Sequence, residues 1–172
     1  MKLARIRYRA GQAIRHLINQ PDPAVDTALR ELVPEDQWHL LARLAPADRV
    51  HLLTVHRELV RMNEQDPDLL KAALLHDVGK ADEQVTVTLT HRVLHVLLNK
   101  LSPSLTRRIA RKQGGWIAHG MYLTLQHPSL GAELVRLTGA SERTCWLIEH
   151  HTDGTIRDDA HLNVLQMVDA RE

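Results

Sequence analysis

Apolar residues recur with helical spacing along most of this 172-residue chain, and prolines and glycines divide the pattern into short segments. In PADRVHLLTVHRELVRM, residues 46–62, Leu52, Val55, Leu59 and Val60 would form one stripe, and Pro46 fits the first helical turn. Helices that each carry one apolar stripe bury it against one another. The pattern therefore predicts an all-α fold, a helical bundle with short connections.

The same pattern, read with the capping preferences of prolines, serines and glycines, places the other helices. Val85, Val87 and Leu89 alternate as in a strand, but most of 85–101 reads as helix. Pro128 fits the first turn of a new helix, which would put His127 at or beside its cap. The remaining helices are expected at 2–19, up to about Leu32, from Pro34, at 69–77 with Gly79 just past the end, at 116–126 after the Gly114-Gly115 break, from Ser141 after a stop at Gly139, and through LNVLQMVDA at the end.

Composition narrows the class of protein. The chain is 44% apolar and 25% charged, as in globular domains, and it has no Phe, so Leu, Val, Ala and Ile must fill the core. A single cysteine, Cys145, excludes an internal disulfide. The chain has no signal segment and no long apolar run, and its net charge is only +1, so we expect a cytoplasmic protein with no membrane partner. It also lacks a basic, aromatic-rich surface, so nucleic acid is not the expected substrate.

The stretch LLKAALLHDVGK, residues 69–80, ends a nearly all-apolar run with His76 and Asp77. Two titratable groups at the end of a buried helix are costly to desolvate unless they have partners. A metal ion is the natural partner, because imidazole and carboxylate are metal ligands and a helix C-terminus carries partial negative charge.

Other candidate ligands are distributed over several predicted helices, many of them near helix ends. This is how a helical bundle builds a metal site in its core. The ligand types suit Zn, Fe, Mn, Co or Ni, and carboxylates can bridge two ions, so one or two divalent metals are expected with their identity open. The candidates beside His76 and Asp77 are His51, His127, His150, His151 and Asp169.

This H…HD…H…H…D pattern resembles the HD-domain superfamily of metal-dependent phosphohydrolases. AALLHDVGK resembles the central motif of that family, and HPSLGAELV, LIEHH and LQMVDA are similar to the segments that follow it. The resemblance covers about residues 46–171. It predicts an HD domain at 46–172, with residues 1–45 as an N-terminal helical extension packed on the core.

The resemblance also implies roles. His51, His76, Asp77 and Asp169 would hold one metal, and Asp77 would bridge to a second metal held by His127 and by His151 or His150. Asp77 and Lys80 would be the catalytic residues, with Lys80 contacting a substrate phosphate or the attacking water. Arg92 and the basic run 107–112 are further candidates for holding phosphate charge.

Two choices among histidines stay open on spacing alone. His56 lies about 140° around the helix from His51, so both cannot easily face one metal. HLLTVHREL resembles the family segment that begins with the ligand, which favours His51. His150 and His151 point about 100° apart, and His151 is the preferred ligand. The other histidines are interpreted as structural or on the surface, with His91 and His119 closest to the pocket.

The function implied by the resemblance is hydrolysis of a phosphoester by a metal-activated hydroxide. The expected substrate is a small phosphorylated compound, such as a nucleotide. The alternatives are a cyclic-dinucleotide phosphodiesterase, a di-iron oxygenase on the same scaffold, and a non-catalytic nucleotide-binding module. The sequence leaves a homo-oligomer open.

Overall fold

A computed structural model describes residues 21–171, which form nine α-helices and one 3-10 turn. The all-α prediction is confirmed, while the helix expected at 2–19 lies outside the described residues. The elements are α2 (Pro23–Leu32), α3 (Glu35–Ala42), α4 (Pro46–Arg61), α5 (Pro67–Leu75), η1 (Val78–Lys80), α6 (Leu89–Leu101), α7 (Pro103–Ile109), α8 (Trp116–Leu137), α9 (Glu142–His150) and α10 (Ala160–Asp169).

Short polar side chains begin many of these helices. Asp66 accepts a hydrogen bond from the backbone N–H of Leu69 at the start of α5, and Ser141 accepts one from Thr144 at the start of α9. Asp22, Ser102 and Asp159 cap α2, α7 and α10 in the same way. Such caps satisfy N–H groups that have no partner inside the helix, which fixes where each helix starts.

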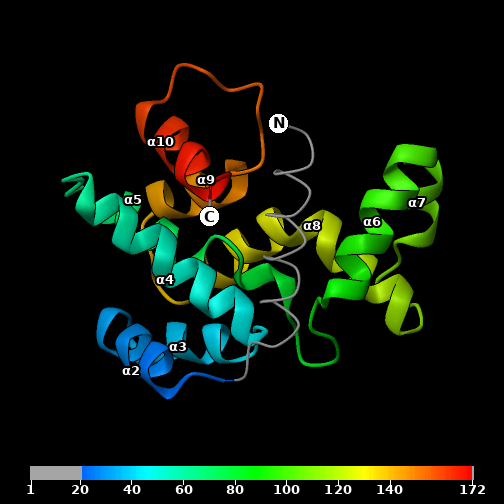
Figure 1. The fold of residues 1–172 in the computed structure, drawn as a ribbon, viewed down its shortest axis with the longest axis horizontal. Coiled ribbons are helices and arrows are strands. Elements are labelled where there is room, and N and C mark those ends of the chain that lie inside the picture. The colour runs from blue at the N-terminus through cyan, green and yellow to red at the C-terminus, as the bar shows by residue number, and fades with distance from the viewer. Residues whose placement is uncertain (1–20, 172) are drawn as a thin grey trace, which may run out of the picture.

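One hydrophobic core joins the helices. In Figure 1, α4 and α5 lie beside α9 and α10, and α8 passes behind them. Leucines dominate this core, as the absence of Phe requires, and Leu52, Leu75 and Leu165 are fully buried. Leu29 of α2 and Leu41 of α3 belong to the same cluster. The division into an extension and a domain at residue 45 stays a prediction.

Pro128 does not begin a helix, contrary to the expectation from sequence. It lies inside α8, which runs without interruption from Trp116 to Leu137, and His127 lies in mid-helix rather than at a cap. Proline has no N–H to donate to the carbonyl four residues earlier, here that of Thr124. His127 Nδ1 lies 2.9 Å from that oxygen, and its N–H replaces the missing donor. The helix therefore continues through the proline.

Gly79 is also placed differently from the expectation. It does not adopt the left-handed conformation of a glycine that ends a helix. Among the described residues, the glycine with positive φ is Gly139, at 74°, and this confirms the helix stop expected at Gly139. Gly79 lies in η1 against α8, where an added Cβ would be 2.2 Å from the carbonyl oxygen of His127. Its missing side chain lets η1 approach α8 closely, so that Asp77, just before η1, reaches His127.

The remaining segments largely follow the predicted pattern. Most of 85–101 is helical, as expected, and the residues before Leu89 include Thr86, which forms an isolated β-bridge with Ala81. Val60 is 50% exposed and so does not belong to the inner stripe of α4. In the described part of the chain, no helix is long and apolar enough to cross a membrane.

Candidate metal centre

The fold brings all six preferred ligand candidates to one place. His51 lies within α4, and His76 and His151 occupy the C-caps of α5 and α9. Asp77 directly follows His76, His127 lies within α8, and Asp169 is the last residue of α10. Five helices thus converge on the site, and the six side chains come from five separate parts of the sequence.

Asp77 lies between two groups of histidines. Its Oδ1 is 3.5 Å from His127 Nε2 and 3.8 Å from His151 Nε2, while its Oδ2 is 3.7 Å from His76 Nε2. In the set of His51, His76 and Asp77, and again in that of Asp77, His127 and His151, potential ligand atoms all lie within 4.8 Å of one another. The two sets share Asp77, an arrangement in which a carboxylate could serve two cations.

Asp169 lies beside His51 and His76, the two histidines that form a set with Asp77. Its Oδ1 lies 2.9 Å from His51 Nε2 and 3.4 Å from His76 Nε2. One carboxylate thus contacts two histidines that come from different helices. The side chain of Asp169 is 29% exposed, whereas that of Asp77 is 2% exposed, so Asp169 lies nearer the solvent.

Three of the histidines are oriented by the same local contact. The Nδ1 atoms of His76, His127 and His151 lie 3.1, 2.9 and 2.6 Å from the carbonyl oxygens of residues three positions earlier, Ala73, Thr124 and Ile148. A carbonyl can only accept, so each neutral ring carries its proton on Nδ1. Each Nε2 therefore directs a lone pair into the site, as in histidines that bind metals.

These lone pairs lack proton donors. His127 Nε2 and His151 Nε2 lie 3.2 Å apart, and neither neutral ring has a proton on that atom to donate to the other. His76 Nε2 is fully buried and makes no hydrogen bond. Buried acceptors without donors are costly, and a cation would satisfy them. The residues present therefore fit a divalent metal ion.

The electrostatics of the site keep both carboxyl groups in the ionised form, which binds metal. Burial would raise the pKa of Asp77, but Lys80 and the surrounding histidines outweigh it and hold that pKa well below its usual value. Burial would likewise raise the pKa of Asp169, but its contacts with His51 and His76 lower it. Both carboxyl groups are thus ionised at neutral pH.

Burial has the opposite consequence for two of the histidines, because it penalises their charged form. It lowers the pKa of His127 to about 4 and that of His151 to about 3, so both rings are neutral at neutral pH. For His76, burial would lower the pKa, but the charges of Asp77 and Asp169 raise it above the usual value. A metal that binds His76 therefore competes with a proton there.

Two cationic side chains lie near Asp77. Lys80 Nζ is 2.5 Å from Asp77 Oδ2. Arg92 of α6 forms an ion pair with Asp48, whose carboxylate is buried, and both Asp48 and Asp77 act to raise the pKa of Arg92. The arginine side chain is 32% exposed, so it also reaches solvent. Arg107 and Arg108 instead lie on α7, which packs on α6 and α8.

His56 and His150, the alternatives to His51 and His151 as ligands, lie in other surroundings. His56 lines a different cavity of about 310 Å³, together with Leu32 of α2 and Val60 of α4. The ring of His150 packs against Trp146, with ring centroids 4.7 Å apart. The geometry thus brings His51 and His151, not these neighbours, to Asp77.

Asp48, which pairs with Arg92, and Asp82, which contacts His119, were not anticipated from sequence. Asp48 lies three residues before His51, on the same face of α4, so helical spacing could have indicated it. His119 Nε2 lies 2.7 Å from Asp82 Oδ2, and His91 contacts Thr88 and the carbonyl of Trp116. His91 thereby joins α6 to α8, which agrees with its interpretation as structural.

Comparison with known proteins agrees with this geometry. A search of curated proteins and a search of solved structures each found no match. A family model described as HD domain matches residues 38–172, a span that includes all six residues gathered around Asp77. The chain therefore belongs to the HD-domain family of metal-dependent hydrolases.

Proposed function

We propose that this protein is a phosphohydrolase that cleaves a phosphoester of a small substrate, such as a nucleotide, with the help of one or two divalent metal ions. The observation that carries the proposal is the position of Asp77 among His76, His127 and His151, whose Nε2 lone pairs have no proton donor. His51, His76, Asp77 and Asp169 would hold one ion, and Asp77, His127 and His151 a second.

Bound divalent cations lower the pKa of water and neutralise phosphate charge. The side chains of the site supply the rest. Asp77, which both sets share, would be the common ligand, and Lys80 Nζ, which contacts its carboxylate, would donate to a phosphate oxygen. Arg92, anchored by the buried Asp48, offers a second donor beside the site. These two cations favour a substrate with negative charge.

Metal content and hydrolysis measured together test the proposal. The purified full-length protein is compared with Asp77→Ala and with Asp158→Ala, an exposed acid on the loop before α10. We expect wild type and Asp158→Ala to bind metal and hydrolyse members of a phosphoester panel, and Asp77→Ala to lose both properties. Equal hydrolysis by Asp77→Ala would refute the mechanism. Oxygen consumption by the iron-loaded protein, without phosphoester hydrolysis, would show an oxygenase instead.

Lys80→Ala separates binding of substrate from binding of metal. If Lys80 acts on a phosphate, the variant keeps its metal and loses rate. Loss of metal together with rate would show that Lys80 serves only to hold Asp77 in position.

A further inference from the structure

The segment from residue 84 to residue 132 contains no Asp or Glu. It contains six Lys and Arg residues, although the net charge of the whole chain is only +1. The segment includes α6, α7 and the connection to α8. A low net charge of the whole chain is therefore compatible with a cationic part of the molecule. Its basic residues are Arg92, Lys100, Arg107, Arg108, Arg111 and Lys112.

The outer face of α6 is apolar and exposed. Val93, Val96, Leu97 and Leu101 are 49%, 50%, 55% and 81% exposed. Their spacing of three and four residues puts them on one face of the helix, and Lys100 shares that face. Across the turn, Leu105 of α7 and Trp116 at the start of α8 are also exposed. Trp116 packs on the buried His91 at the other side of α6, so it is not part of this face. We name the five aliphatic residues, with Lys100, Arg107 and Arg108, the α6–α7 surface.

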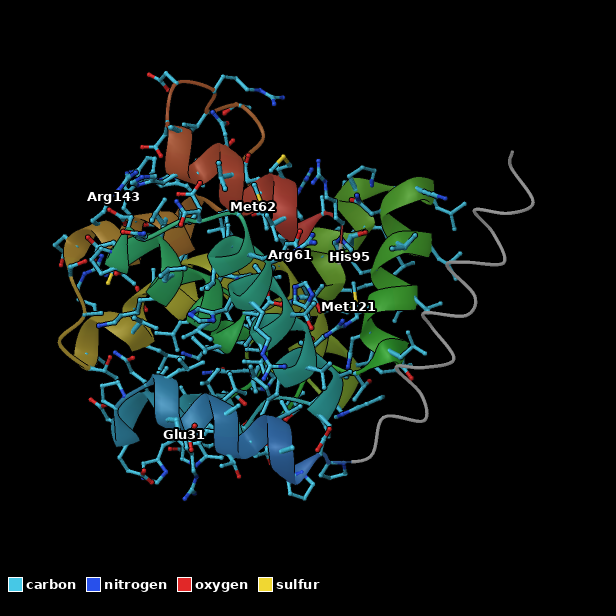
Figure 2. The ribbon with its side chains drawn as sticks, turned by 60° about the vertical axis from the view of Figure 1, so that its left-hand side comes forward. Glu31, Arg61, Met62, His95, Met121 and Arg143 are labelled. Atoms are coloured by element: carbon cyan, nitrogen blue, oxygen red, sulfur yellow. The ribbon has the colours of Figure 1, made fainter. Side chains whose placement is uncertain are left out.

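The α6–α7 surface lies at an edge of the molecule. Helices α6 and α7 pack on each other and on α8 (Figure 1), and the view in Figure 2 also shows them side by side. Arg92, on a different face of α6, pairs with Asp48 of α4. The helix thus has an inner side directed to the metal centre and an outer side with aliphatic residues and Lys100, and the exposed Arg107 and Arg108 follow on α7.

We propose that the α6–α7 surface docks on an anionic lipid surface. Two packed helices that expose aliphatic and basic side chains at one edge are suited to lie in the interface of a bilayer, where the apolar residues enter the acyl boundary and the cations meet lipid phosphates. A second copy of this chain would bring like charges together. Nucleic acid would satisfy the arginines but would leave the aliphatic residues of α6 without apolar partners. The net charge alone had suggested no membrane partner.

Co-sedimentation of the full-length protein with vesicles tests this proposal. Phosphatidylglycerol vesicles are compared with phosphatidylcholine vesicles, at low and at high salt. One test protein is the double variant Arg107→Glu, Arg108→Glu. Its control is the double variant Arg157→Glu, Arg171→Glu, which changes the net charge equally at exposed sites elsewhere. Leu97→Gln with Leu101→Gln is matched against Leu137→Gln, a leucine 86% exposed at the far end of α8.

We expect salt-sensitive binding to phosphatidylglycerol and little to phosphatidylcholine. A basic residue near an anionic surface contributes roughly fivefold in affinity, so losing Arg107 and Arg108 should weaken binding about 30-fold or more. The double leucine variant should also bind less, and both matched controls should bind as wild type.

Four results would overturn the proposal. The first two are no binding to either kind of vesicle, and equal losses of vesicle binding in the test and control variants. The other two are a dimer in sedimentation velocity that the leucine substitutions dissociate, and DNA binding that those substitutions leave unchanged. None depends on the hydrolase activity, so the two proposals fail separately.

Discussion

His127 and His151 face each other through their Nε2 atoms, 3.2 Å apart, and each ring directs Nδ1 to the carbonyl of the residue three positions earlier. The two histidines come from α8 and α9, which pack together. Since both protons are engaged by backbone oxygens, the contact joins two acceptors. A cation between them, also touching Asp77, would relieve their repulsion.

Substitution of the two adjacent histidines at the end of α9 should affect metal affinity unequally. His151→Gln should weaken metal binding by more than about 100-fold, because loss of an outer partner of a ligand alone costs 10–100-fold. His150→Gln should leave metal affinity unchanged, because that ring packs on Trp146. Metal titration of the two variants by calorimetry checks this. A loss in His150→Gln equal to that in His151→Gln would contradict the assignment.

Pro128→Ala should separate helix stability from metal affinity. The new backbone N–H would compete with His127 Nδ1 for the carbonyl of Thr124. We therefore expect the free energy of unfolding to stay equal or rise, and metal affinity to fall by up to about tenfold as the orientation of the His127 ring relaxes. Chemical denaturation and metal titration of the same samples measure both.

The exposed neighbour Gln126 provides a control, as Gln126→Ala should change neither quantity. A Pro128→Ala protein that is less stable but binds metal normally would show that the contact of His127 with Thr124 does not orient the ring.

Gly79→Ala should destabilise the fold. The added methyl group would lie 2.2 Å from the carbonyl oxygen of His127 and 2.7 Å from the backbone nitrogen of Gly131. Forcing η1 away from α8 should cost about 1–3 kcal/mol in the free energy of unfolding, as overpacking commonly does. Gly115→Ala is the control, since an added Cβ there meets no atom within 4 Å. Equal unfolding midpoints for the two variants would be inconsistent with this close approach.

The metal-free protein should lose stability as the pH falls below about 6.5. An unfolded histidine titrates near 6.5, whereas burial lowers the pKa of His127 to about 4 and that of His151 to about 3. Between these values the unfolded chain binds protons that the folded chain does not, so the free energy of unfolding decreases by up to about 1.4 kcal/mol per pH unit for each histidine.

His76 acts in the opposite direction. Its pKa is raised on folding, so the stability it contributes is fully present below 6.5 and is lost as the pH rises through its folded pKa. Urea unfolding of chelator-treated protein at about pH 7 and about pH 5 measures the sum. In His151→Gln the decrease should be smaller, and an undiminished decrease would show that His151 is not the buried neutral group responsible.

The sequence by itself determined most of the described helices and indicated the kind of chemistry, but it predicted a helix start at Pro128 that the structure does not have. Capping residues such as Asp66 and Ser141, together with the leucine stripes, act within a few residues of one another, so the spacing along the chain suffices to predict them. The His76-Asp77 pair at the end of an apolar helix indicated a metal for a similarly local reason, namely the cost of burying two polar groups.

Only the tertiary structure decided which side chains meet. Spacing shows that His51 and His56 lie on different faces of α4. The packing of α4 against α10 and α2 determines that the face with His51 reaches Asp169 and that the face with His56 lines the cavity beside α2. The path of α8 through Pro128 likewise depends on a side chain that replaces the missing donor, and the approach of Gly79 depends on another helix. These relationships join residues distant in sequence, and local preferences carry no information about them.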